Sequence, residues 1–125
     1  MNTQTEEKLT AQQIKDRLAQ CIGTDVWYRH YLGQLFTQGV QDMAELCGAY
    51  WLIDAVMSHQ NSKAAREAPF QVWTLTVDDD SAVLTMQQDS DQPAEIKQEI
   101  PFTDFPLDRI QLYHIDNVLL LPSEY

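Results

Sequence analysis

The chain has 125 residues, which is the length of a single domain. Its composition, with 44% hydrophobic and 22% charged residues, is that of a globular protein and excludes a wholly disordered chain. Asp and Glu number 19 against 8 Lys and Arg, which gives a net charge of −11. Nonspecific nucleic-acid binding and attachment to anionic membranes both need clustered basic residues, so this charge argues against direct contact with either.

The N-terminal segment, residues 1–8, is polar and is predicted to be flexible, whereas residues 9–125 are predicted to form one domain. The segment lacks the basic-then-apolar pattern of an export signal. No stretch of the chain reaches the roughly 18 apolar residues of a membrane span. We therefore expect a cytoplasmic protein that does not attach to membranes.

The first predicted element is a helix that begins after Thr10. Thr10 followed by Gln13 fits a capping box, in which each side chain bonds the backbone N–H of the other residue. Ile14 and Leu18 then repeat at helical spacing and indicate one buried face. Gly23 suits the position just past the end of this helix.

Two further segments complete the N-terminal half. Residues 24–39, TDVWYRHYLGQLFTQG, are rich in aromatic and β-branched residues and favour short extended segments, although a helical turn fits as well. Residues 40–60 repeat apolar side chains at helical spacing, and Gly48 either ends one helix or lies inside a longer one. Residues 50–57 contain Asp54 as their one polar residue, which is typical of a buried helix.

The second half changes to the period of two that is typical of strands. Five short segments there are rich in β-branched or aromatic residues: 70–77, 82–88, 94–100, 109–115 and 118–122. Turn residues lie between them, and Asp116–Asn117 has the length of a tight hairpin connection. We therefore predict an α+β fold, with two or three N-terminal helices packed on a C-terminal antiparallel sheet of about four or five strands.

The residue spacing gives little support to metal-dependent or nucleophilic catalysis. The histidines, His30, His59 and His114, belong to no HxxxH, HExxH or CxxC ligand pattern, and no cofactor is predicted. The cysteines, Cys21 and Cys47, lie in helical segments and are expected to be reduced and buried. The chain has no GxSxG elbow and no glycine-rich phosphate loop. We predict no catalytic residue and no metal site.

Residues 27–31, WYRHY, place an arginine and a histidine among three aromatic rings. In an extended segment the odd-numbered side chains point to one face and the even-numbered ones to the other. We favour a strand that crosses the core with its polar groups bonded internally, because aromatic residues are first of all core material. The functional alternative is an aromatic-walled pocket for an anionic ligand, with these candidate binding residues: Arg29, His30, Asp54, Trp51 and His114.

Asp54 is the sharpest single candidate, because burying an unpaired carboxylate costs several kcal/mol. We favour a structural carboxylate that accepts hydrogen bonds from Arg29, a tryptophan indole or backbone N–H groups, and catalysis is the alternative. His59 follows Asp54 by five positions and lies on a different side of the helix. An Asp54–His59 dyad within this helix is therefore geometrically poor.

Four segments are similar to segments of a known family: YRH at 28–30, GAYWLIDAV at 48–56, IPFTDFPLD at 100–108 and the terminal LLLPSEY at 119–125. Over residues 24–125 the chain resembles a family of small bacterial and phage- or plasmid-associated proteins of unknown function. The resemblance implies a cytosolic, mobile-element setting, and it brings no activity, cofactor or catalytic residue. For the terminal segment we favour a final core strand with Tyr125 covering an edge, over a recognition tail for a partner.

The function that we favour is a small, acidic, non-catalytic protein-binding module of a mobile element or its host, with another protein, a basic one on charge grounds, as partner. The first alternative is a binder of small anionic ligands, or an enzyme, built on the candidate binding residues. The second is a nucleic-acid mimic directed at a basic host protein, which needs carboxylates spaced like phosphates. The third is a homo-oligomer whose apolar sheet face is its interface.

Overall fold

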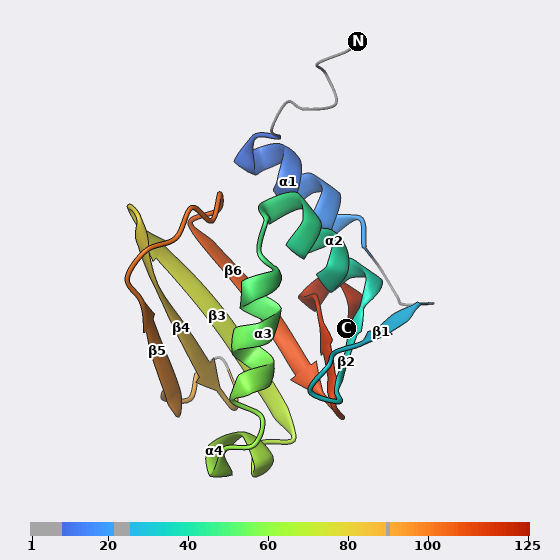
Figure 1. The fold of residues 1–125 in the computed structure, drawn as a ribbon, viewed down its shortest axis with the longest axis vertical. Coiled ribbons are helices and arrows are strands. Elements are labelled where there is room, and N and C mark those ends of the chain that lie inside the picture. The colour runs from blue at the N-terminus through green and yellow to red at the C-terminus, as the bar shows by residue number, and fades with distance from the viewer. Residues whose placement is uncertain (1–8, 22–25, 90) are drawn as a thin grey trace.

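The computed structural model describes residues 9–21, 26–89 and 91–125, which form an α+β fold around one sheet (Figure 1). The elements in chain order are α1 (Ala11–Ala19), β1 (Trp27–Arg29), β2 (Leu35–Thr37), α2 (Gln38–Cys47), α3 (Tyr50–Ser58), α4 (Lys63–Arg66), β3 (Phe70–Asp78), β4 (Ser81–Gln87), β5 (Ile96–Ile100), β6 (Arg109–Ile115), β7 (Val118–Leu120) and the 3-10 helix η2 (Pro122–Glu124). The 7-stranded sheet has the order β1-β2-β7-β6-β3-β4-β5. Neighbouring strands are antiparallel except β2 and β7, which are parallel.

The sheet is larger than the sequence predicts. The strands expected in the second half are present as β3 to β7, but β1 and β2 extend the sheet to 7 strands. Because β2 lies parallel to β7, the sheet is mixed and not purely antiparallel. The helices are not all ahead of the strands either, since β1 and β2 separate α1 from α2. A strand as short as β2 depends on its non-local partner β7, and a local sequence pattern does not reveal that partner.

The helix ends follow local signals. Thr10 and Gln13 form the predicted capping box at the start of α1, whose C-cap is Gln20, and Gly23 lies outside the described residues. Gly48 ends α2 in the left-handed conformation, with a φ of 61°. This conformation favours glycine, and it separates α2 from α3 where the sequence also allowed one longer helix.

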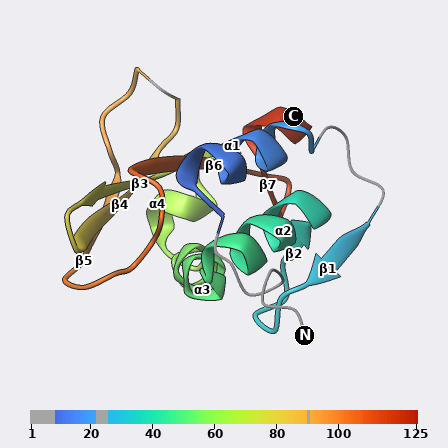
Figure 2. The ribbon, with the colours of Figure 1, turned by 90° about the horizontal axis from the view of Figure 1, so that it is seen from above.

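Helices α2 and α3 cover one face of the sheet and form the core with it (Figures 1 and 2). The buried side chains of α3 are Leu52, Ile53, Val56 and Met57. The largest fully buried apolar side chains of the strands come from alternate positions: Trp73, Leu75, Leu84, Met86, Leu112 and Leu119. The strand register explains this layer, because Trp73 lies opposite both Met86 and Leu112.

The other face of the sheet carries the side chains of opposite parity. On β3 and β6, Phe70 and Tyr113 meet edge to face with ring centroids 5.1 Å apart. Tyr125 stacks on Phe70 at 5.6 Å and is 76% exposed. Tyr125 therefore covers the middle of the sheet and not an edge, so the expectation for this residue is wrong.

Strands β6 and β7 form the predicted tight hairpin. Ile115 pairs with Val118, which leaves Asp116 and Asn117 as the turn. Both turn residues have positive φ, 52° and 69°, a conformation that Asp and Asn adopt more readily than other residues with side chains. The hairpin delivers Leu119 to the core with 0% exposure, as a final core strand requires.

Glu124 of η2 fastens the C-terminal segment to the start of α2. Its Oε1 accepts hydrogen bonds from the Thr37 hydroxyl at 2.7 Å and from the Leu121 N–H at 2.9 Å. Its Oε2 accepts the Gly39 N–H, in the first turn of α2, at 3.2 Å. That turn has no acidic residue of its own, so Glu124 supplies the negative charge that a helix N-terminus favours.

Gly39→Ala tests this contact. An added Cβ would lie 2.6 Å from the Glu124 carboxylate and must displace it, so we expect the free energy of unfolding to fall by about 1–2 kcal/mol. In a Glu124→Ala background the same substitution should be neutral or stabilising by up to about 1 kcal/mol, because alanine is the better helix former. Urea unfolding of the four proteins measures both effects. A neutral Gly39→Ala in the native background would contradict the fastening role of Glu124.

Candidate functional site

The β1–β2 turn, residues 30–34, is closed by its own backbone. The His30 N–H donates to the Gln34 carbonyl at 2.7 Å, and the Gly33 N–H donates to the His30 carbonyl at 2.8 Å. Gly33 has a φ of 104°, which residues with side chains rarely adopt. The turn therefore gives His30, Tyr31 and Gln34 defined positions.

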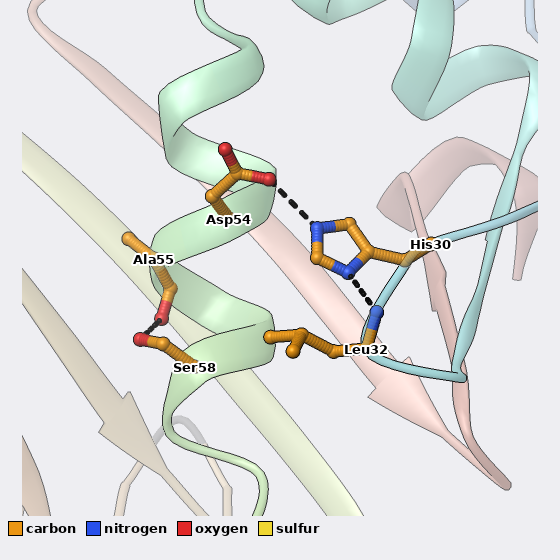
Figure 3. A network of polar contacts seen from close by, with 5 residues as sticks. All are labelled: His30, Leu32, Asp54, Ala55 and Ser58. Carbon is orange, nitrogen blue, oxygen red and sulfur yellow. Dashed lines mark hydrogen bonds and ion pairs between the residues drawn. The ribbon is translucent and has the colours of Figure 1, made fainter.

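His30 fastens this turn to α3 (Figure 3). Its Nε2 lies 2.7 Å from Asp54 Oδ1, and its Nδ1 accepts the Leu32 N–H at 3.1 Å. Because Nδ1 is an acceptor, the ring hydrogen is on Nε2 and is donated to the carboxylate. The ring is 5% exposed and both of its nitrogens are bonded, so His30 is occupied in holding the turn.

Asp54 differs from its prediction in both burial and partner. The side chain is 51% exposed and lies on the outer side of α3, not in the core. In the described part of the chain its bonding partner is His30, and neither Arg29 nor a tryptophan indole bonds it. The apolar composition of α3 predicts burial on every side, but the helix packs on one face of the sheet and leaves Asp54 toward solvent.

The interpretation of WYRHY as a core strand is wrong for most of its side chains. β1 is an edge strand, and Trp27 and Tyr31 are 52% and 79% exposed. Arg29 is exposed as well, and its Nη1 donates to the Gly33 carbonyl at 3.3 Å. The strand does alternate, but its odd-numbered positions point to the sheet face that α2 and α3 do not cover. His30, with the opposite parity, is buried.

Trp51 contributes to packing. Its ring meets Phe105 edge to face, with centroids 6.3 Å apart. Phe105 is 5% exposed and belongs to the connection between β5 and β6. This contact joins the GAYWLIDAV and IPFTDFPLD segments, and the His30–Asp54 bond adds the YRH segment. Three of the four segments that carry the family resemblance therefore meet in the fold.

His114 on β6 fastens the same turn at its other end. Its Nε2 bonds the side-chain oxygen of Gln34. The side chain is 4% exposed, and burial lowers the pKa of His114 to about 4, against the opposing effect of a bond with its own backbone. The turn is thus held twice, by His30 to α3 and by His114 to β6.

A polar cavity of about 440 Å³ lies beside His114. Its buried wall is a pair of glutamines, in which Gln60 and Gln71 exchange two hydrogen bonds of 3.0 Å through their side-chain amides. The Trp73 indole N–H also donates to Gln71 Oε1 at 2.7 Å, and Gln60 Nε2 donates to the Val56 carbonyl at 3.1 Å. These bonds tie the end of α3 to β3 and occupy the amide groups of the cavity wall.

The cysteines are free thiols without the character of nucleophiles. Burial raises the pKa of Cys47 to about 11. Burial, followed by the charges of Asp42 and Glu124, also raises the pKa of Cys21, which is partly exposed and not buried as expected. A raised pKa keeps a thiol protonated, so both side chains are poorly suited to nucleophilic attack.

The remaining histidine, His59, stacks on Trp73 with ring centroids 5.7 Å apart, and its Nε2 lies 2.8 Å from Gln98 Oε1. Within residues 9–21, 26–89 and 91–125, no group of three or more His, Cys, Asp and Glu side chains has a geometry that could hold a metal ion. In the same ranges, every helix is too short or too polar to cross a membrane.

Exposed apolar side chains gather around β1, a feature that the sequence did not predict. Five of the seven exposed large hydrophobic side chains among the described residues are Val26, Trp27, Tyr31, Leu32 and Tyr50, and the other two are Phe102 and Tyr125. We call the first five residues the β1 patch. They lie beside or on β1, on its turn and at the start of α3. The strand alternation is visible in the sequence, but nothing in the sequence tells which face of β1 stays uncovered.

A family model matches residues 12–125, and it describes a family of unknown function, DUF6876. The chain belongs to this family. The match confirms the resemblance to a family without an assigned function, whereas its phage or plasmid setting stays a prediction. Neither the curated proteins nor the solved structures give a match to the chain. Membership of DUF6876 brings no activity with it.

His30→Ala should lower the free energy of unfolding by about 2 kcal/mol, because the Leu32 N–H loses its acceptor and Asp54 its partner. Asp54→Ala should cost less, about 1 kcal/mol, because its carboxylate is half exposed to water. Asp54→Asn keeps an oxygen for the His30 N–H and should lie closer to the native protein. Urea unfolding gives the order of the three variants. A loss for Asp54→Ala as large as for His30→Ala would contradict the central position of His30.

The buried state of His114 predicts a loss of stability in acid. Its pKa is about 4 in the fold against an ordinary 6.5, so between these values the unfolded chain binds a proton that the folded chain does not. The stabilisation is complete above the higher value and is lost as the pH falls toward the lower one, by about 3 kcal/mol. Between neutral pH and a pH of about 4, the unfolding free energy of the native protein should fall by about 3 kcal/mol more than that of His114→Gln. Equal losses in urea titrations would contradict this account.

Proposed function

We propose that this protein is a non-catalytic module that docks on another protein through the β1 patch. The observation that carries the proposal is the concentration of exposed apolar side chains on one short edge strand, its turn and the start of α3. Exposed apolar side chains gathered in one region of a protein commonly mark an interaction site. Tryptophan and tyrosine, which the patch contains, are also the residue types that most often dominate binding energy in protein interfaces.

β1 offers backbone groups as well as side chains. The Val26 carbonyl and the His30 N–H both bond toward β2. Because backbone groups alternate along a strand, those of Trp27 and Arg29 point to the outer edge of the sheet. An extended segment of a partner protein can pair with this edge as an additional strand, with its side chains beside Trp27.

The chemistry-bearing side chains support binding over catalysis. His30 and His114 are bonded within the fold, and the pKa values of Cys21 and Cys47 are raised. The net charge of −11 favours a basic partner and a binding affinity that falls with salt. A cytoplasmic setting, in a mobile element or its host, is part of the proposal.

Self-association is the second candidate, and the aromatic cluster on the sheet face opposite α2 and α3 favours it. Phe70, Tyr113 and Tyr125 contact one another there, with ring centroids between 5.1 and 5.6 Å apart. Two copies of the chain would bury these rings against each other. The molar mass from light scattering distinguishes this assembly from docking on a different protein.

A photo-cross-linking amino acid in place of Tyr31 tests the proposed docking surface. We expect it to capture a specific protein in host cells, whereas the same amino acid in place of Phe102, 73% exposed beside the opposite edge strand β5, should not. Calorimetry with the purified partner should then show at least about tenfold weaker binding to Trp27→Ala, because a buried tryptophan anchor is lost. Phe102→Ala is the matched control and should bind like the native protein. Equal affinities for the two variants would reject the β1 patch.

A further inference from the structure

We infer that Asp54 and Tyr31 form a subsite for an arginine side chain of the partner. The inference rests on the proposed function and adds the chemistry of one contact to it. Asp54 is not a member of the β1 patch, and an apolar patch alone does not select a charged side chain. The deciding observation is a half-exposed carboxylate whose histidine partner carries an exposed, stacked tyrosine ring.

One hydrogen bond orients the Asp54 carboxylate, and this bond uses one of its two oxygens. Its Oδ1 accepts the His30 Nε2–H at 2.7 Å, and Figure 3 shows Oδ2 directed away from this bond. No residue in the described part of the chain bonds Oδ2. Because the buried His30 ring fixes the orientation of the carboxylate, an incoming donor meets an acceptor that needs little further ordering.

The histidine that bonds this carboxylate also stacks on an exposed aromatic ring. Tyr31 stacks on the His30 ring, with centroids 4.3 Å apart and an interplanar angle of 29°, so the histidine that holds Asp54 also positions Tyr31. Tyr31 is 79% exposed, which leaves its other ring face open to solvent. Tyr50 precedes Asp54 by four positions on α3, and residues at this spacing lie on the same side of a helix. A side chain that enters here can contact a ring face and a carboxylate oxygen together.

The charges around the subsite select a cation. Within the described ranges, His30 is the one side chain that bonds Asp54, and it does so as a hydrogen-bond donor. Arg29, the basic residue next to it in sequence, bonds the Gly33 carbonyl and has the opposite strand parity to His30. The Tyr50 hydroxyl donates to Glu45, which adds a second carboxylate on this side of α3. Complementary charge on the partner therefore favours association and register at this point.

Arginine fits this arrangement better than lysine. The planar guanidinium stacks on an aromatic face while its N–H groups, which lie in its plane, donate to a carboxylate. The ammonium group of lysine is a compact and strongly hydrated charge without a stacking surface. An open tyrosine face and a carboxylate that share His30 as their partner therefore point to a guanidinium.

An acetylated and amidated hexa-arginine peptide is the probe, and the hexa-citrulline peptide is its neutral isostere. Titration followed by amide NMR should move the signals of Tyr31, Leu32 and Asp54 most, and only with the arginine peptide. Asp54→Asn keeps the oxygen for His30 and loses the charge, so we expect about fivefold weaker binding of the peptide. Asp80→Asn removes the same charge from the exposed β3–β4 turn and should change the affinity by less than about twofold.

A matched pair of variants, Tyr31→Ala and Tyr31→Phe, tests the aromatic part of the subsite. Tyr31→Ala should weaken binding of hexa-arginine by about threefold, because the stacking face is lost. Tyr31→Phe keeps the ring and should bind like the native protein. Equal affinities for these two variants would remove Tyr31 from the subsite.

Equal effects of Asp54→Asn and Asp80→Asn, or signal changes centred on the β3–β4 turn, would show only a general attraction to an acidic protein and would overturn the inference. The proposed function is judged separately, by cross-linking at Tyr31 and by Trp27→Ala. If Trp27→Ala weakens partner binding while Asp54→Asn leaves partner and peptide binding unchanged, the arginine subsite fails and the docking surface stands. If Trp27→Ala also has no effect, both fail.

Discussion

The double fastening of the β1–β2 turn is the constraint on which the candidate site depends. β1 and β2 have three residues each, and an isolated pair of strands is at best marginally stable in water. Two side-chain bonds attach their turn to larger elements: His30 bonds Asp54 on α3, and Gln34 bonds His114 on β6. The parallel pairing of β2 with β7 adds the third attachment. The exposed side chains of β1 have defined positions because of these bonds.

The histidines take part in structural contacts. Each histidine is engaged with a structural partner: His30 with Asp54, His114 with Gln34 and His59 with Gln98. The groups that face solvent beside the turn include tyrosine and tryptophan rings and one carboxylate oxygen that no described residue bonds. Such groups are common in recognition surfaces, and this is the reason for which we propose binding as the function.

The sequence indicates which residues are candidates for the site better than it indicates how they are arranged. Asp54 stands out in the sequence because it interrupts an apolar helix, and His30 because it lies among aromatic rings. His30 and Asp54 are 24 positions apart in the chain, and no rule of sequence spacing predicts a contact over this separation. The exposure of Trp27, Arg29 and Tyr31 depends on β1 being the last strand of the sheet, and that position is a property of the strand order. The site roles of these residues stay predictions.

The sequence by itself determined the features that depend on contacts between near neighbours in the chain. The capping box of Thr10 and the turn at Asp116–Asn117 each depend on a few consecutive residues, as do the alternating strands of the second half. Only the tertiary structure decided which faces stay open and which distant groups meet. Glu124 reaches Thr37 across 87 positions, and β2 joins β7 in parallel. Burial and pairing of this kind follow from the packing of the whole chain, so a local pattern of polarity, which records only the sequence neighbours of a residue, does not specify them.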